Sequence, residues 1–381
     1  TSAGEKRNPQ SIGEMENWAL SSHGAAFNIL ESMTLKGDGA GDAKTRALIY
    51  SALASKDPTK IKELERISAQ PQSLKVLKDN ITSLGLKVSP MKDGKEMKDF
   101  NRAFDSLKVT PAKDELILKM IGKDNKVKNG RTYWIDSNGE EKPEKGGLYD
   151  PTIFGETDEE KMNKWGYIEL PQAIPLPALN GIQKKANPYM ALTPFKKVTD
   201  INKIMTDPHV VVITDPKKTN FKEGQIVNVK DVEEAIFDKG EDLEFKAGGE
   251  AIKHYLKKVN VDKDLKEVSE ELKSTNNSKK ISELYPRYKI LKNLKDNKLE
   301  ASDLVTNIIP VPPEYMRARL KQGKNRVVHS GLNNLYRDLG NFVEDTDKIK
   351  ALGFDDKDAY TAADNNAKLW QMVSQVQGYE E

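Results

Sequence analysis

Some residue types and patterns are missing from the sequence, and each absence excludes a class of protein. The 381 residues include no cysteine, which excludes disulfides and every metal site built on thiolates. No apolar run approaches the roughly 20 residues that a membrane-spanning helix needs, and no signal peptide is visible. We therefore expect a soluble protein with no membrane partner.

The patterns that usually carry catalysis are also absent. The four histidines, His23, His209, His254 and His329, lie far apart without a metal-binding spacing, so each is interpreted as a core or surface histidine. There is no G-x-x-x-x-G-K-[ST] phosphate loop and no G-x-S-x-G nucleophile. A D-x-D-x-D cluster suited to magnesium is missing as well. Taken alone, the chain predicts no catalytic residue.

Charge is abundant but unevenly distributed. The formal net charge is only +2 although 31% of the residues are charged. Residues 315–326 contain five basic and no acidic residues, whereas residues 344–358 are acidic on balance. Because phosphates respond to nearby charges, the basic stretch is the better candidate for nucleic-acid contact.

The sequence changes character several times along its length, which suggests two or three domains at roughly 100–200 residues each. Residues 1–90 show helical periodicity, and 91–103 show none and are expected to form a linker. Residues 104–310 mix short strand-like runs with a charged helical hairpin, and two amphipathic helices are predicted within 332–381. The fold class we predict is α+β.

The first predicted helix has an apolar face that includes Met15 and Trp18 and extends to Met33. Ser11 and Glu14 form an S-x-x-E pattern typical of a capping box at a helix start. By itself the pattern indicates an ordinary helix that packs on a core, and it predicts no function.

Several segments resemble one protein family in the family's own order. A segment near the C-terminus of the β subunit of multisubunit DNA-directed RNA polymerases resembles GEMENWALSSHGAAFNILESMTLKGD. The last helix and strand of that subunit are similar to QPQSLKVLKDNITSLGLKV. FDSLKVTPAKDEL resembles the start of the β′ subunit. Further segments follow in β′ order: KPEKGGLYDPTIFG, WGYIELPQAIPLP, KEGQIVNVKDVEEAI, IIPVPPEYMRARL and SGLNNLYRDLGNF. Collinear matches over almost the whole chain make the resemblance specific.

The resemblance implies a division of the chain into clamp elements. Residues 1–90 would be a β C-terminal clamp-base segment, with the linker 91–103 joining it to a β′ N-terminal clamp core at 104–310. Residues 311–331 would form the lid, a projecting loop, because Pro310 and the prolines after it disfavour a sheet strand. Residues 332–381 would form an antiparallel clamp-helix hairpin.

The chain also departs from the family. Between Gly155 and Trp165, where the family usually has a four-cysteine zinc ribbon, it has ETDEEKMNK. It stops before the aspartate loop that holds the catalytic magnesium in the family. The resemblance therefore implies one subunit of a nucleotidyltransferase, with Mg²⁺ on another chain and neither zinc nor another cofactor in this one.

The resemblance assigns roles to three groups of residues. The clamp base, where the β and β′ parts would meet, includes Glu14, Glu16, Trp18, Lys142, Gly147 and Phe154. The lid and its basic track would contact nucleic acid through Arg317, Arg319, Lys321, Lys324 and Arg326. The residues expected to dock a promoter-specificity factor are Asn334, Tyr336, Arg337, Glu344 and Asp345.

The division and fusion of subunits resemble the split polymerases of giant bacteriophages. The implied partners are the rest of β and of β′, the DNA template, nascent RNA and a promoter factor, in the host cytoplasm during infection or packaged in the virion. FVEDTDKIK stands where the family has a basic tract, so a dedicated factor is expected. The alternative is a non-catalytic clamp mimic or scaffold that binds a host polymerase or nucleic acid.

Overall fold

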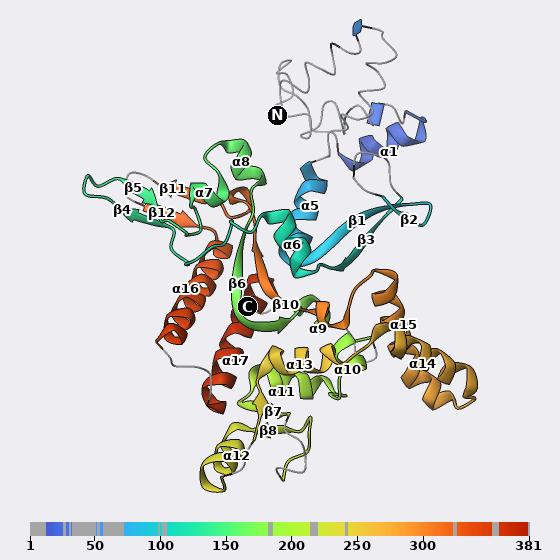
Figure 1. Cartoon of the computed structure of the whole chain (residues 1–381). Helices are drawn as coiled ribbons and strands as arrows, with labels where there is room; N and C mark the ends of the chain where they lie inside the picture. The colour runs from blue at the N-terminus through green and yellow to red at the C-terminus, as the bar shows by residue number, and fades with distance from the viewer. Residues whose placement is uncertain are drawn as a thin grey trace. The chain divides into compact units, whose positions relative to one another are not determined.

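The computed structural model describes most of the chain: residues 13–25, 28–29, 32, 51, 54–55, 72–97, 100, 105–181, 186–213, 220–240, 243–322, 326–352 and 358–379. The chain divides into two compact units (Figure 1). The first comprises Thr1–Ile81 and Val88–Val109, and the second comprises Thr82–Lys87 and Thr110–Glu381. Helices and small antiparallel sheets make up the chain, which confirms the predicted α+β class.

The first unit contains helix α1 (Glu14–Ser22), which is shorter than the sequence predicts. Gly24, at φ +70°, donates its N–H to the carbonyl of Ser21, and the next residue donates to the carbonyl of Leu20. This pair of bonds is a Schellman motif, which ends a helix. The prediction of one helix to Met33 was therefore wrong. The N-cap of α1 is Gly13, so the predicted cap at Ser11, which lies outside the described residues, was wrong as well.

A three-stranded sheet, in the order β2-β1-β3, spans the predicted linker. Its strands are β1 (Leu86–Lys92), β2 (Lys95–Glu96) and β3 (Ser106–Pro111). Asp93 and Gly94, at φ +49° and +71°, form the turn between β1 and β2. Two residues with positive φ are what a two-residue type I′ hairpin requires, and Asp-Gly is one of its preferred pairs. The first half of the expected linker is therefore a β-hairpin.

Before this sheet, α5 (Gln72–Ser83) ends at a glycine, as the sequence predicts. Gly85 has φ +74° and donates its N–H to the carbonyl of Thr82. Glycine reaches this left-handed conformation without steric cost, which is why it commonly follows a helix.

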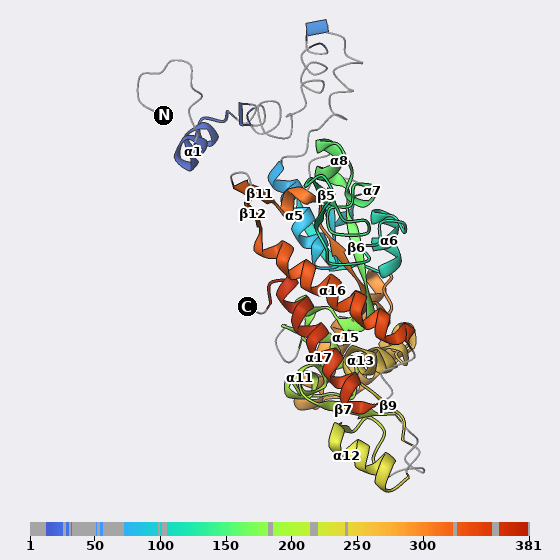
Figure 2. The ribbon, with the colours of Figure 1, turned by 90° about the vertical axis from the view of Figure 1, so that its left-hand side faces the viewer.

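The second unit is built around two long antiparallel strands, β6 (Gly166–Pro175) and β10 (Val305–Val311), at the centre of Figure 1. Helices α13 (Gly248–Lys257) and α16 (Gly331–Ala351) pack against β6. Helix α17 (Ala359–Val376) packs against α16 and against α11 (Val198–Thr206), and the α16–α17 pairing can be followed in Figure 2. The fully buried side chains of this core include Ile168, Ile174, Ile309, Leu339 and Leu369.

A second sheet in this unit has the order β8-β7-β9. Its central strand β7 (His209–Val212) confirms the strand predicted from HVVVITD, with β8 (Ile226–Asn228) and β9 (Phe245–Lys246) on either side. The charged helical hairpin, which the sequence predicts from Ala251 to about Asn297, is three helices: α13 is followed by α14 (Val261–Ser274) and α15 (Ser278–Asp296), and the last two form the hairpin.

The remaining elements of this unit are short or peripheral. They are α6 (Asp114–Ile121), β4 (Tyr133–Ile135), β5 (Glu141–Pro143), α7 (Pro151–Phe154), α8 (Asp158–Asn163), α9 (Pro177–Asn180), α10 (Pro188–Leu192), α12 (Val229–Glu233), β11 (Arg319–Gln322) and β12 (Arg326–His329). None of the helices within the described residues combines the length and the hydrophobicity of a membrane-spanning segment.

Candidate nucleic-acid interface

The segment expected to be a projecting loop is a β-hairpin. Strands β11 and β12 pair antiparallel, from Arg319 opposite His329 to Gln322 opposite Arg326. The prolines that argued against strands all precede Arg319, so none occupies a position in this ladder. The prediction of a loop without strands was therefore wrong for Arg319–Gln322 and Arg326–His329.

A buried arginine fixes the base of this hairpin. The Arg317 side chain is fully buried and donates hydrogen bonds from Nε to the Pro312 carbonyl (2.8 Å), from Nη1 to Asn333 Oδ1 (3.1 Å) and from Nη2 to the Leu148 carbonyl (3.0 Å). Because a guanidinium holds its donors in a rigid fork, these bonds fix three separate chain segments at once. Burial lowers the pKa of Arg317.

Aromatic side chains enclose the same guanidinium. Its Cζ lies 4.6 Å from the ring centroid of Phe154 and 5.4 Å from that of Tyr149. The Tyr149 hydroxyl donates to the carbonyl of Arg317 (3.0 Å), and Asn333 Nδ2 donates to that carbonyl (2.7 Å) and to the Tyr149 hydroxyl. Ring faces attract a cation, so these contacts offset part of the cost of burying the charge.

Arg319, the next predicted phosphate contact, also turns inward. Its side chain is only 14% exposed, its Nη2 lies 2.5 Å from Glu141 Oε2 on β5, and its Cζ lies 3.8 Å over the ring of Tyr133 on β4. Figure 1 shows the β4–β5 and β11–β12 hairpins next to each other.

Arg317 and Arg319 do not occupy the phosphate-facing positions that the sequence predicts. Both guanidinium groups bind partners inside the protein instead. The side chains of Lys321, Lys324 and Arg326 lie outside the described residues, and their contact with nucleic acid stays a prediction.

Three of the predicted clamp-base residues lie around or near this arginine. Phe154 is fully buried against it, and Gly147 directly precedes Leu148, whose carbonyl accepts a hydrogen bond from Arg317. A Cβ on Gly147 would lie 2.4 Å from the carbonyl oxygen of Arg131, so no larger residue fits there. Lys142 on β5 is half-exposed and pairs with Asp136 at 2.6 Å.

The other three clamp-base residues lie on α1, in the first unit. Glu16 Oε2 accepts a hydrogen bond from the Gly13 N–H (2.9 Å), and Glu14 is exposed. Trp18 is 64% exposed and Met15 is 74% exposed, so the expected burial of this face does not occur among the described residues. Contact between α1 and the segment around Phe154 stays a prediction.

The predicted docking residues on α16 divide into one core residue and four others. Tyr336 is buried, and its hydroxyl donates to the Pro310 carbonyl (3.0 Å), so it cannot contact a docked factor in this arrangement. Asn334, Arg337 and Asp345 are exposed. Glu344 pairs with Lys348 (2.7 Å) and with Arg131 (3.7 Å).

The residues that organise this region but were missed from the sequence are Asn333 and Tyr149. Asn333 lies in the first turn of α16, whose N-cap Ser330 accepts a hydrogen bond from its backbone N–H. The S-G-L-N pattern in the sequence is typical of a capped helix start. It does not predict that the Asn333 side chain is buried and accepts a hydrogen bond from Arg317.

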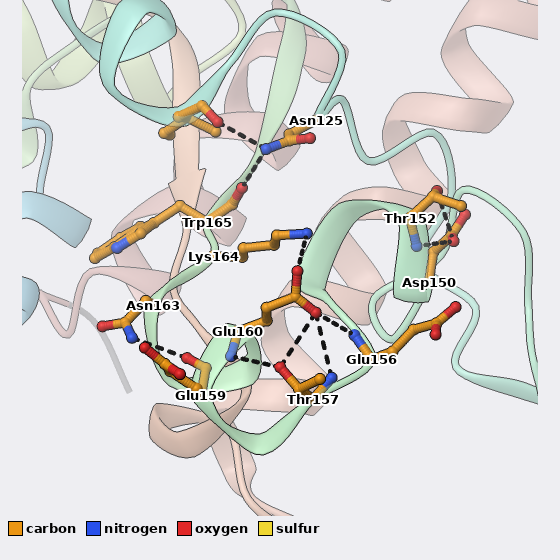
Figure 3. Close-up of polar contacts among 11 residues, drawn as sticks. Asn125, Asp150, Thr152, Glu156, Thr157, Glu159, Glu160, Asn163, Lys164 and Trp165 are labelled. Atoms are coloured by element: carbon orange, nitrogen blue, oxygen red, sulfur yellow. Dashed lines mark hydrogen bonds and ion pairs between the residues drawn. The ribbon is translucent and has the colours of Figure 1, made fainter. Parts of the chain in front are cut away.

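Residues 156–164, where the resemblance places a zinc ribbon, contain a short capped helix, α8 (Figure 3). Glu160 Oε2 accepts hydrogen bonds from the N–H groups of Glu156 (3.1 Å) and Thr157 (3.3 Å), and its Oε1 lies 2.8 Å from Lys164 Nζ. Thr157 Oγ1 in turn accepts from the Glu160 N–H (3.3 Å), which completes a capping box. Among the described residues, no cluster of three or more His, Asp or Glu side chains gathers as a metal site would require.

This capping network predicts a pH-dependent helix start. The hydrogen bond from Lys164, followed by those from the two backbone N–H groups, lowers the pKa of Glu160 from 4.5 to about 2. Because the folded-state pKa is depressed, the stabilisation is present above pH 4.5 and is lost as the pH falls toward 2. Carboxyl NMR should show Glu160 titrating near 2, and Lys164→Met should raise that midpoint. Lys161→Met is the control and should leave the Glu160 midpoint unchanged. An unaltered midpoint in Lys164→Met would contradict the conclusion that Lys164 lowers the pKa of Glu160.

Comparisons with known proteins find similarity to subunits of multisubunit RNA polymerases. Residues 9–93 match the family model of RNA polymerase Rpb2, domain 7. A DNA-directed RNA polymerase subunit beta′ from Chromohalobacter salexigens is 25% identical over 267 residues, covering 61% of this chain and 18% of the relative. The same subunit from Ectopseudomonas mendocina is 31% identical over 138 residues, covering 36% and 10%.

The chain thus spans between a tenth and a fifth of the length of these curated relatives. The matches support a component of a multisubunit RNA polymerase.

Proposed function

We propose that this chain is a structural, nucleic-acid-contacting subunit of a multisubunit DNA-directed RNA polymerase. It would join the C-terminal part of a β subunit to the N-terminal part of a β′ subunit, in a split polymerase of a giant bacteriophage. The observation that carries the proposal is the β11–β12 hairpin, anchored by Arg317, in a chain whose matches are Rpb2 domain 7 and β′ subunits. The catalytic Mg²⁺ would lie on another chain, and this chain would need no zinc.

The hairpin suits a lid that separates RNA from its template. A hairpin that separates RNA from DNA must keep its position in the polymerase. Here Arg317 holds the base of the hairpin through hydrogen bonds, and the ion pair of Arg319 with Glu141 joins β11 to β5. Lys321 and Arg326 lie further along the two strands. Together with Lys324, which lies outside the described residues, their basic side chains would attract phosphates of the separated strands.

Deletion of the hairpin tip tests this role in the reconstituted polymerase. Replacing residues 321–326 by Gly-Gly, which retains Arg317 and Arg319, should leave assembly intact but lengthen the RNA–DNA hybrid and slow RNA release. A matched variant, Lys321→Gln/Lys324→Gln/Arg326→Gln, keeps the hairpin and should reduce only the salt dependence of binding, by a slope of about 0.7–0.9 per lost phosphate contact.

Two results would contradict the proposal. Hybrids of unchanged length in the deletion variant would reject the lid, and RNA synthesis by the isolated chain would reject the placement of the metal site on another chain.

The exposed face of α16 would dock a promoter-specificity factor. Asn334, Arg337 and Asp345 are available on it, and Asp347 is exposed as well. Because charges at the rim of an interface choose partners through complementarity, this acidic face would select a factor with a basic or apolar contact surface.

Charge reversal on α16 separates docking from general function. Asp345→Lys/Asp347→Lys should reduce promoter-specific initiation while elongation on a tailed template continues. Glu270→Lys, on exposed α14, is the control and should leave both unchanged. If initiation persists in the α16 variant, docking by this face is excluded.

The second candidate function is a non-catalytic clamp mimic that binds a host polymerase or nucleic acid. Both candidates require interfaces, but only a polymerase subunit requires companion chains that supply the catalytic aspartates. Copurification from infected cells distinguishes them: a partner chain with a D-F-D-G-D loop supports the first, and a complete host polymerase as the partner supports the second.

A further inference from the structure

A cavity of about 580 Å³ lies between α10, the segment after it and α15, far along the sequence from the lid hairpin. Two cationic side chains line it, Lys196 and Arg287. The burial of Lys196, with Arg287 nearby, lowers the pKa of the lysine. The two positive charges therefore interact across a shared space.

The hydrogen-bond partners of Lys196 and Arg287 do not use all of their N–H donors. Lys196 Nζ donates to the carbonyls of Thr193 (2.8 Å) and Met190 (3.4 Å), neither of which carries a charge. Arg287 Nη2 pairs with Asp264 on α14 (3.0 Å), but its Nε is buried without a hydrogen-bond partner among the described residues. Because both acceptors of Lys196 are uncharged, an anion placed in the cavity would gain a charge-assisted hydrogen bond from the lysine.

The rest of the lining indicates the kind of anion. Met190, Leu284 and Pro286 give the cavity an apolar side, and Glu283 places one carboxylate at its edge. A nucleic-acid backbone carries a negative charge on every phosphate. It would make no favourable contact with the apolar side of the cavity, and Glu283 would repel it. A single carboxylate beside an apolar side chain fits both surfaces.

The helix that carries Arg287 has an excess of basic residues, of which Lys280, Arg287 and Lys295 pair with acidic residues of α14. Helix α15 has six basic and two acidic residues. Complementary charge steers a partner to such a surface, and the cavity would then select its geometry.

We propose that this cavity binds an acidic side chain of a partner polypeptide. The carboxylate lies between Lys196 and Arg287, and an adjacent apolar side chain packs against Met190 and Leu284. The proposal is independent of the polymerase assignment, because it uses no residue of the hairpin, the clamp base or the α16 face.

A defined peptide tests it by fluorescence anisotropy with the full chain. The probe is a fluorescein-labelled peptide of three Asp-Leu pairs, compared with its Asn-Leu counterpart and with single-stranded DNA. Lys196→Gln/Arg287→Gln should weaken binding of the acidic peptide about tenfold or more, because two charge-assisted contacts are lost. Lys279→Gln/Lys292→Gln removes the same charge from exposed positions of α15. This control should change the affinity for the acidic peptide by about twofold or less.

A gain-of-affinity variant excludes misfolding as the explanation. Glu283→Gln removes the carboxylate at the edge of the cavity and should tighten binding of the acidic peptide. Equal losses in the cavity and control variants, or an Asn-Leu peptide that binds as well as the acidic one, would overturn the proposal. So would DNA binding that the cavity variant alone weakens, because the site would then be one for nucleic acid.

Discussion

Replacing Arg317 by Met should lower the free energy of unfolding of the second unit by on the order of 3–5 kcal/mol. Three acceptors, on Pro312, Leu148 and Asn333, would lose their donor in a buried site. Each buried acceptor left unpaired costs about 1–3 kcal/mol, and methionine would recover only part of the packing against Phe154. The loss should exceed that of any exposed arginine.

Urea unfolding followed by tryptophan fluorescence measures this effect. Trp370 is buried in the core of the same unit and reports its unfolding. Arg337→Met is the matched control, because Arg337 is exposed and its one ion pair among the described residues is with its neighbour Asp338. It should change the free energy of unfolding by about 0.5 kcal/mol or less. Arg317→Lys keeps the charge but not the fork, and should fall between them. An Arg317→Met midpoint equal to that of the control would show that the buried bonds contribute nothing.

Local patterns predicted much of the fold because they act over a few residues. The strand from His209, the charged hairpin α14–α15 and the glycine cap at Gly85 all follow from nearby sequence. The hairpin turn at Asp93–Gly94 was equally local, and an Asp-Gly pair is a strong hairpin signal. It was missed because residues 91–103 show no apolar periodicity: only the end of β1 falls among them, and β2 is two exposed residues.

The candidate site was harder to predict because charge in a sequence does not reveal burial. Arg317 and Arg319 are two of the five basic residues in a stretch without acids, so a solvated, phosphate-facing stretch was the natural interpretation. Their acceptors come from distant positions: Leu148 and Glu141 lie more than a hundred residues away along the chain. Tyr336 was misplaced for the same reason, since its acceptor is the Pro310 carbonyl on β10.

A second position in this region should be intolerant of even a methyl group. A Cβ on Gly130 would lie 1.9 Å from the carbonyl oxygen of Arg337 and 2.8 Å from Asn341 Oδ1. From the other side, a Cβ on Gly340 would lie 2.8 Å from the Cα of Gly130. The loop before β4 and the helix α16 therefore meet backbone to backbone, through two glycines.

Gly130→Ala should destabilise the second unit by about 3 kcal/mol, at the upper end of the usual cost of overpacking, because a helix carbonyl cannot move aside as a flexible side chain can. The displaced loop leads directly to Tyr133, which lies under Arg319, so the β11–β12 hairpin should lose protection from hydrogen exchange as well. Gly331→Ala is the control: its Cβ would meet nothing within 4 Å at the first residue of α16, and stability should stay the same or rise by up to about 1 kcal/mol. If urea midpoints and hairpin exchange rates are the same in both variants, the glycine contact does not position the hairpin.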